Sequence, residues 1–256
     1  MTKPYEKWIV IYDTHIPYFD KKSWRAIEAY MADEVFDGWL HGGDLVDLNE
    51  LSRWNEDTPR LKTEKTQQTF DKANKFLDIQ QKIVRANNKD AKFVLLEGNH
   101  EYRVEYYMDR HPELTGLLEV KKNLRLEERG IKWVRSWTKG HMYKKGHAFF
   151  THGLYISKYH AHKMVDTFGT CIFYGHSHDV MEMPKTFAGN DKTLVGKSLG
   201  CTCDYKQTYL KGNPTKWQQA ITIFNFLPNG FFNEYVIKIF NHKFIAPNGK
   251  VYDGNK

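Results

Sequence analysis

Side chains that can bind a metal ion follow five short apolar runs along this chain. Each run is rich in β-branched and aromatic residues and stops at a glycine or a polar residue, which is typical of a buried strand and its end. The polar residues at these ends are Asp13 and His15, Asp44 and Asp47, Asn99 and His100, His152, and His176 and His178. One such residue is ordinarily part of a turn, whereas five ends in series predict a single shared site.

The types of these side chains indicate which ions they could hold. Carboxylate and amide oxygens mixed with imidazole nitrogens suit Mn²⁺, Fe, Zn²⁺ or Ni²⁺ better than Ca²⁺, which prefers oxygen alone. No cysteine is among them, which excludes a thiolate site. The candidate ligands are more numerous than one four- to six-coordinate ion needs beside a reactive water. They therefore predict two divalent ions that share a bridging carboxylate. Such a pair leaves excess positive charge, which a phosphate ester would neutralise.

The elements that must position these residues alternate between strands and helices. Strands are expected over 7–12, 39–41, 92–97, 148–151 and 171–174. A helix is expected over 70–84, where apolar residues follow helical spacing. Such alternation implies parallel strands, whose carboxyl ends gather ligand sites, so all five ends are expected at one edge. The alternating runs 220–226 and 234–240 predict antiparallel strands that complete a second sheet.

The motifs at these strand ends resemble those of a known family, the calcineurin-like metallophosphoesterases, in order and in approximate spacing. They are D-x-H (13–15), G-D-x-x-D (43–47), G-N-H-E (98–101), H-G (152–153) and G-H-S-H (175–178). With a helix-rich insert over about 49–90, the chain is similar to the small members that bacteriophages encode. The resemblance implies an α/β fold, a β-sandwich of two mixed sheets flanked by helices, as a single domain over 1–256.

The resemblance also implies a role for each motif residue. Three residues would hold one ion, three would hold the other, and one carboxylate would bridge them. In that order they are Asp13, His15 and His178; Asn99, His152 and His176; and Asp44. A hydroxide shared by the two ions would then attack phosphorus in line.

The same family pattern implies a general acid. His100 would protonate the leaving oxygen, and Asp47 would orient His100 and raise its pKa toward neutrality. Arg103 follows on the same segment and could clamp a phosphate. The alternative for Arg103 is a surface position paired with Glu101 or Glu105.

Charge is unevenly distributed along the 256 residues, whose net charge is +7. The stretch 121–147 alone holds nine basic and two acidic side chains. The basic residues proposed to guide a polynucleotide are Lys121, Lys122, Arg125, Arg129, Lys132 and Arg135. The stretch predicts DNA or RNA as a partner, and the alternative is a solvated basic face.

Other residues have simpler interpretations. His160 and His162 lie on a helix expected over 155–168, and solvent-exposed structural roles are expected for both. Trp133 and Trp137 are expected to pack one sheet face, with stacking on bases as the alternative. The three cysteines, Cys171, Cys201 and Cys203, are interpreted as structural thiols. No apolar run approaches the roughly 20 residues that span a bilayer, and no signal peptide is evident, which predicts a cytoplasmic protein without a membrane partner.

Three functions compete on these observations. The G-H-S-H motif and the basic stretch favour a phosphodiesterase or nuclease, with manganese as the favoured metal. A phosphomonoesterase, either a nucleotidase or a protein phosphatase, is the first alternative. A non-catalytic nucleic-acid-binding protein of the same fold is the second. The sequence leaves open the natural ester, the native metal and the oligomeric state.

Overall fold

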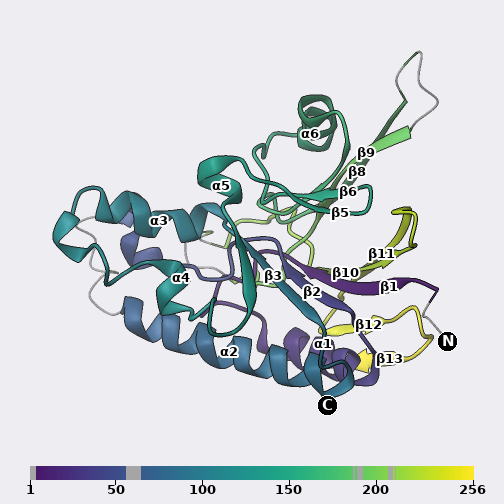
Figure 1. Ribbon diagram of the computed structural model, residues 1–256, viewed down its shortest axis with the longest axis horizontal. Coiled ribbons are helices and arrows are strands. Elements are labelled where there is room, and N and C mark those ends of the chain that lie inside the picture. The colour runs from purple at the N-terminus through teal and green to yellow at the C-terminus, as the bar shows by residue number, and fades with distance from the viewer. Residues whose placement is uncertain (1–3, 56–64, 187, 189–192, 207–209, 211) are drawn as a thin grey trace.

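The computed structural model describes residues 4–55, 65–186, 188, 193–206, 210 and 212–256. Two mixed sheets pack against each other, and helices cover their outer faces (Figure 1). This arrangement confirms the expected α/β sandwich. Among the described residues, no helix is both long enough and apolar enough to cross a membrane.

The first sheet has six strands in the order β11-β10-β1-β2-β3-β4. Its parallel strands are β1 (Glu6–Ile11), β2 (Gly38–His41), β3 (Lys92–Leu96) and β4 (Ile131–Val134). Its antiparallel strands are β10 (Ala220–Phe226) and β11 (Phe232–Lys238). These two strands extend the first sheet, so the prediction that they complete a second sheet is wrong. Nearly every residue of β10 is buried, as required of a strand covered on both faces.

The second sheet has the order β5-β6-β7-β9-β8. Its strands are β5 (Tyr143–Lys145), β6 (Ala148–Phe150), β7 (Cys171–Tyr174), β8 (Val180–Thr186) and β9 (Thr193–Leu199). Strand β7 is parallel to both β6 and β9. A separate hairpin pairs β12 (Lys243–Ile245) with β13 (Val251–Asp253). All five strands that the sequence places before a candidate ligand are present within one or two residues.

Helices occupy the outer faces of both sheets. Helix α1 (Lys21–Asp33) begins where the Asp20 carboxylate accepts hydrogen bonds from two backbone N–H groups. The described residues between β2 and β3 include the 3-10 helices η1 (Asn49–Leu51) and η2 (Arg53–Asn55) and the long helix α2 (Thr66–Asn87). This is the helix-rich segment expected there, and α2 is longer at both ends than predicted.

The remaining helices are short. They are α3 (Asn99–Met108), η4 (Pro112–Leu114), α4 (Val120–Asn123), α5 (Ser136–Lys139) and α6 (His160–Phe168). Helix α6 packs on β8 and β9. It starts five residues later than the sequence predicts.

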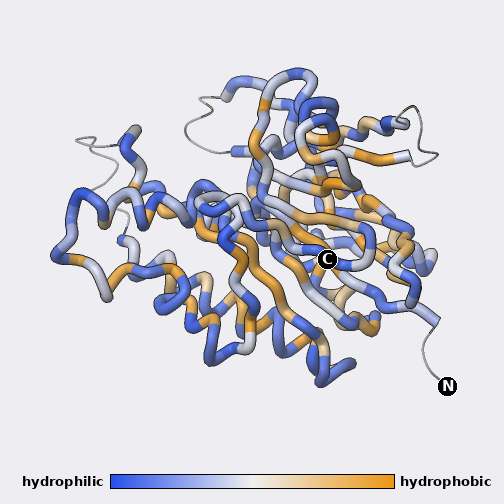
Figure 2. Tube along the Cα trace, turned by 45° about the horizontal axis from the view of Figure 1, so that its top comes forward, coloured by the Kyte–Doolittle hydropathy of each residue, from blue (hydrophilic) through white to orange (hydrophobic). Residues whose placement is uncertain are grey.

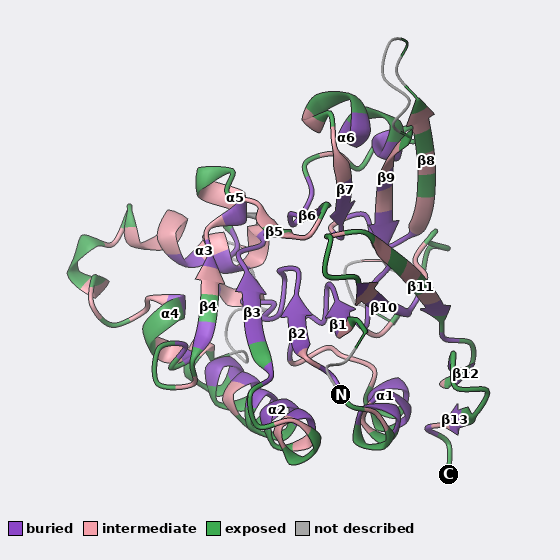
Figure 3. Ribbon diagram, turned by 45° about the vertical axis from the view of Figure 1, so that its right-hand side comes forward, coloured by how far each residue is buried: buried purple, intermediate pink, exposed green. Residues whose placement is uncertain are grey.

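The core has two main layers, which follow the alternation of side chains along β1. Trp8 and Val10 face the second sheet and pack with Phe173 and Phe224, whereas Ile9 and Ile11 face the helices. Figure 2 shows hydrophobic residues along the interior strands, and Figure 3 shows that these strands are the most buried. Because β1 is buried on both faces, its sequence is a continuous apolar run.

Candidate metal centre

The candidate ligands converge from the carboxyl ends of strands in both sheets. Strands β1, β2 and β3 of the first sheet lead to Asp13, Asp44 and Asn99, and strands β6 and β7 of the second lead to His152 and His176. The expectation of one sheet edge is therefore wrong. The two sheets pack face to face, so ends from both reach the same place.

The backbone at these strand ends is strained. Nine described residues other than glycine have a positive φ, and five of them are candidate ligands. They are Asp13 (51°), His15 (52°), Asp44 (53°), His176 (65°) and His178 (59°). This left-handed conformation costs free energy for residues with a side chain, and it persists where a functional site requires it. The chain turns abruptly at each ligand and directs its side chain to a common point.

The first group comprises Asp13, His15 and His178, all buried, whose candidate ligand atoms lie within 4.8 Å of one another. Nε2 of His15 is 3.1 Å from Nε2 of His178. Oδ2 of Asp13 accepts a hydrogen bond from the His176 N–H, whereas Oδ1 is buried and has no hydrogen-bond partner among the described residues. A buried carboxylate oxygen without a donor is costly. A cation held between these atoms would satisfy it.

The second group comprises Asp44, His152 and His176, and it meets the same 4.8 Å limit. Oδ1 of Asn99 lies 3.0 Å from Nε2 of His152 and so adds a fourth candidate ligand. Oδ2 of Asp44 is 3.3 Å from Nε2 of His152 and 3.7 Å from Nε2 of His15. Asp44 therefore lies between the two groups, where a bridging carboxylate would be placed. The two groups together fit a pair of divalent ions of the nitrogen- and oxygen-binding kind.

Close approaches to glycine let the two carboxylates occupy these positions. A Cβ atom at Gly98 would clash with the side chain of Asp44, and one at Gly175 would clash with the side chain of Asp13. The glycines of the third and fifth motifs are required by this packing.

His100 is positioned differently from the sequence-based expectation. Its Nδ1 lies 2.8 Å from the backbone carbonyl of Asp47, which can accept a hydrogen bond from it. The Asp47 carboxylate lies closer to Nδ1 of His15, at 3.1 Å, than to Nδ1 of His100, at 3.5 Å. Burial lowers the pKa of His100 to about 3, and the Arg103 guanidinium adds to this while Asp44 opposes it. The carboxylates of Asp44 and Asp47 do raise this pKa, as expected of such partners, but burial outweighs them.

Arg103 joins the same cluster. Its guanidinium donates to the Asp47 carbonyl at 2.7 Å and lies 3.0 Å from Nε2 of His100. It does not form the ion pair with Glu101 or Glu105 that the sequence left open, since Glu105 pairs with Arg135. Its side chain is only 19% exposed and lies beside the candidate ligands.

Glu101 is a functional residue that the sequence analysis missed. Its carboxylate accepts four backbone N–H groups, those of Asp44, Leu45, Val46 and Gly98, at 2.7–3.1 Å. It thereby connects the second motif to the third and holds the loop that presents Asp44. The glutamate of G-N-H-E is the signal that could have identified it.

Two tryptophans that border the site were also missed in this role. Trp137 lies on α5 instead of a sheet face, and its ring contacts the rings of His152 and His176. Trp217 contacts the ring of His178. Trp133 packs against the core, as expected.

The environments of two histidines on α6 and of one cysteine bear on the remaining interpretations. His160 is fully buried between Asp179 and Tyr174, so its predicted exposure is wrong, whereas His162 is exposed as expected. His160 is the first residue of α6, and its side chain points inward, where it contacts Tyr174 and Asp179. Cys203 is buried with Sγ 3.9 Å from Nδ1 of His178, and burial raises the pKa of its thiol well above the usual value.

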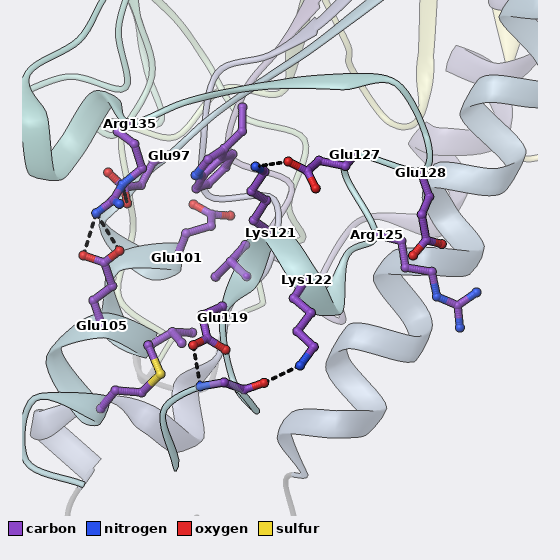
Figure 4. Close-up of a pocket in the computed structure, with 15 residues that line it drawn as sticks. Glu97, Glu101, Glu105, Glu119, Lys121, Lys122, Arg125, Glu127, Glu128 and Arg135 are labelled. Carbon is purple, nitrogen blue, oxygen red and sulfur yellow. Dashed lines mark hydrogen bonds and ion pairs between the residues drawn. The ribbon is translucent and has the colours of Figure 1, made fainter. Parts of the chain in front are cut away.

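Several basic side chains of the stretch 121–147 bind carboxylates of the protein itself. Arg135 binds both Glu97 and Glu105, and Lys121 binds Glu127, along a pocket behind α3 (Figure 4). The Arg129 guanidinium binds Asp78 and Asn74 of α2 and the carbonyl of Leu124. Its side chain is 9% exposed. Arg129 is therefore a structural residue and not a surface contact for nucleic acid.

Comparison with known proteins gives distant relatives. No family model matches the chain. The chain is 27% identical over 226 residues to the Gene 54 protein of Mycobacterium phage L5, which covers 84% of this chain and 87% of that protein. Vacuolar Protein Sorting 29 from Cryptosporidium parvum is 12% identical with a TM-score of 0.49, covering 96% of this chain and 95% of that one. Pseudomonas putida nuclease MPE is 14% identical with a TM-score of 0.34, covering 89% and 87%.

Proposed function

We propose that this protein is a metal-dependent phosphoesterase and that its substrate is a phosphodiester of nucleic acid or nucleotides. The observation that carries the proposal is the convergence of two ligand groups around Asp44, with five of the ligands on strained backbone. Strain concentrated at one set of polar side chains indicates a site retained for chemistry.

The donor set fits two divalent ions, with manganese favoured and iron, zinc or nickel also suited. Asp13, His15 and His178 would hold one ion, Asn99, His152 and His176 the other, and Asp44 both. Ions bound there would supply a nucleophile at neutral pH and neutralise the charge of the phosphate. The contact of Asp47 with Nδ1 of His15 would fix the orientation of that imidazole.

His100 and Arg103 would act on the phosphate ester itself. Nε2 of His100 lies 3.7 Å from Oδ2 of Asp44, so a proton on this nitrogen would be delivered beside the ligand groups. In the structure Nε2 lies against Arg103. A bound phosphate would draw the guanidinium away and place negative charge beside the imidazole, so that Nε2 would take up a proton from solvent and pass it to the leaving oxygen.

The test is hydrolysis by chelator-stripped protein that has been reloaded with Mn²⁺. We expect cleavage of bis(4-nitrophenyl) phosphate only after reloading, and faster than cleavage of the monoester 4-nitrophenyl phosphate. His178→Asn should abolish it, and the matched control His162→Asn, at an exposed histidine outside the site, should not. Metal-loaded protein that cleaves neither ester would overturn the proposal, and a strong preference for the monoester would replace it with a phosphomonoesterase.

A further inference from the structure

Two tryptophans stand on different sides of the candidate metal centre. The Trp137 ring centroid is 5.7 Å from that of His152 and 5.1 Å from that of His176, both in the second ligand group. The Trp217 ring centroid is 4.3 Å from that of His178, in the first group. Each ligand group therefore has one indole against it.

The segment that carries Trp137 is tied to the second group. The Ser136 hydroxyl accepts a hydrogen bond from the backbone N–H of His152 at 3.0 Å, and it lies 2.9 Å from the hydroxyl of Thr151. Helix α5 also begins directly after Arg135, which is bound to Glu97. These bonds hold the segment that carries Trp137 next to His152, whose ring the indole contacts.

The segment that carries Trp217 is tied to the first group in the same manner. The backbone N–H of Gln218 donates to the carbonyl of His178 at 2.7 Å, and the Gln218 carbonyl accepts the N–H of Cys201. The neighbouring Lys216 binds Asp179, the residue after His178. The backbone beside each indole is therefore tied to the segment that carries its ligand histidine.

Both indoles are only half-buried, so each keeps part of its surface in solvent beside the ligands. The solvent-accessible part of a half-buried indole beside a cationic phosphate site offers a stacking surface for a planar ring, and every nucleobase has such a face. Exposed Lys139, two residues after Trp137, adds a positive charge on the same helix.

We infer that Trp137 and Trp217 are specificity-determining residues, each stacking on a base at one side of the scissile phosphate. The substrate class is then a phosphodiester that joins two nucleosides, as in a nucleic-acid strand. This inference rests on the proposed function, because the ligand groups locate the phosphate between the two indoles.

The test compares a dinucleoside phosphate with analogues that lack one base. The probes are deoxyadenylyl-deoxyadenosine and its two abasic forms, in which hydrogen replaces the 3′-side or the 5′-side base. Their kcat and KM are measured with Mn²⁺-loaded protein. Their affinities are measured by calorimetry with a version of each in which CH2 replaces the bridging leaving oxygen, which prevents cleavage and keeps the negative charge. The variants are Trp137→Ala, Trp217→Ala and the corresponding phenylalanine variants.

We expect the wild type to bind the complete dinucleotide about 5- to 100-fold more tightly than either abasic form, the range of one base stacked on an aromatic side chain. Trp137→Ala should remove the preference for one base and Trp217→Ala the preference for the other. Both variants should retain their metal content, measured by elemental analysis, and phenylalanine should restore much of the preference. Phe231→Ala, at an exposed aromatic residue on the β10–β11 turn, is the matched control and should change nothing.

Equal affinity of the wild type for complete and abasic dinucleotides would overturn the inference while cleavage of the chromogenic diester upheld the proposed function. An unchanged base preference in both alanine variants would overturn it as well. If no ester is cleaved, the proposed function fails, and the calorimetric comparison still decides whether the indoles bind bases.

Discussion

The Asp44 carboxylate lies within reach of both ligand groups. Its Oδ2 lies 3.3 Å from Nε2 of His152 and 3.7 Å from Nε2 of His15. We predict that Asp44→Asn lowers metal content at both positions and abolishes turnover, since a neutral amide leaves the positive charge of two ions uncompensated. Elemental analysis and a rate assay on the same sample measure both effects.

The control for this prediction is Asp166→Asn, which removes an exposed carboxylate on α6 beside His162. It should leave metal content and rate unchanged. Retention of both metal ions by Asp44→Asn would contradict the bridging position.

Protons compete with metal at these residues. Although burial opposes it, the carboxylates of Asp44 and Asp13 raise the pKa of His152 to about 9. Burial raises the pKa of Asp13 to about 7. Both groups must lose their protons to bind a metal. We predict that Mn²⁺ binding at pH 7 releases protons and that affinity falls as pH drops from 9 to 6, by about tenfold per pH unit for each proton displaced.

Calorimetry in buffers of different ionisation enthalpy measures the number of protons released. The sign follows from the raised pKa values, because a group that is protonated at pH 7 must be deprotonated by the incoming metal. Affinity that is constant from pH 6 to pH 9 would contradict this assignment.

The sequence was sufficient to predict which side chains converge, since each one follows a recognisable strand end. It was not sufficient for the environment of His100. The burial of that imidazole and its contact with Arg103 depend on how α3 packs against the loop after β2. A pKa set by burial depends on the tertiary structure, whereas a motif specifies only the residue type.

At the scale of elements, the start of α3 holds the loop after β2 through Glu101. We predict that Glu101→Gln lowers the free energy of unfolding by about 2 to 3 kcal/mol, because an amide has one acceptor oxygen and leaves buried N–H groups unsatisfied. It should also weaken metal binding, since the loop carries Asp44. Chemical denaturation and a metal titration measure the two effects.

The matched variant is Glu105→Gln, one turn further along α3, where the carboxylate pairs with the half-exposed Arg135. A surface ion pair of this kind contributes about 1 kcal/mol or less. An effect of Glu101→Gln as small as that of the control would show that the loop does not depend on this carboxylate.

Arg129 connects α2 to the segment before β4. Its guanidinium binds the Asn74 and Asp78 side chains, and its carbonyl accepts hydrogen bonds from Gln81 and Arg85. We predict that Arg129→Gln lowers the free energy of unfolding by about 1 to 3 kcal/mol, because it breaks the charge-assisted hydrogen bond to the carbonyl of buried Leu124 and those to half-buried Asn74 and exposed Asp78. Thermal or chemical denaturation checks the value.

Arg125→Gln, at an exposed residue of the same stretch, is the control and should stay within about 0.5 kcal/mol of the wild type. An equal effect of the two variants would contradict the connecting role of Arg129. The sequence did not separate these two arginines, because both lie in the stretch 121–147 and nothing local identifies a distant partner. Only the position of α2 distinguishes them.

At the scale of the whole molecule, the site exists because two sheets face each other. The sequence predicted the five strand ends well, yet it assigned them to one edge and β10 to the wrong sheet. Sheet membership is decided by long-range pairing, such as Ile9 of β1 opposite Ile223 of β10, and by packing of Phe150 and Phe173 between the sheets. The local pattern of hydrophobic residues does not specify which distant strand or side chain will be the partner.

Members of the basic stretch 121–147 lie on different elements. Lys132 is on β4, and Lys144 is on β5, where it pairs with Phe149 in the middle of β6. Lys139 is on α5, two residues after Trp137, whose ring contacts those of His152 and His176. We therefore expect a polynucleotide whose scissile phosphate lies at the ligand groups to meet Lys139 before the other two.

We predict that Lys139→Gln reduces the slope of log affinity against log salt for single-stranded DNA by about 0.7, the value for one lost phosphate contact. Lys132→Gln and Lys144→Gln remove the same charge from exposed positions on β4 and β5 and should leave the slope unchanged if the strand runs along α5. Binding of a fluorescent oligonucleotide to Mn²⁺-loaded protein at several salt concentrations measures all three slopes. Equal reductions for the three variants would mean that net charge attracts the strand without a fixed path, and no reduction for Lys139→Gln would place the strand elsewhere.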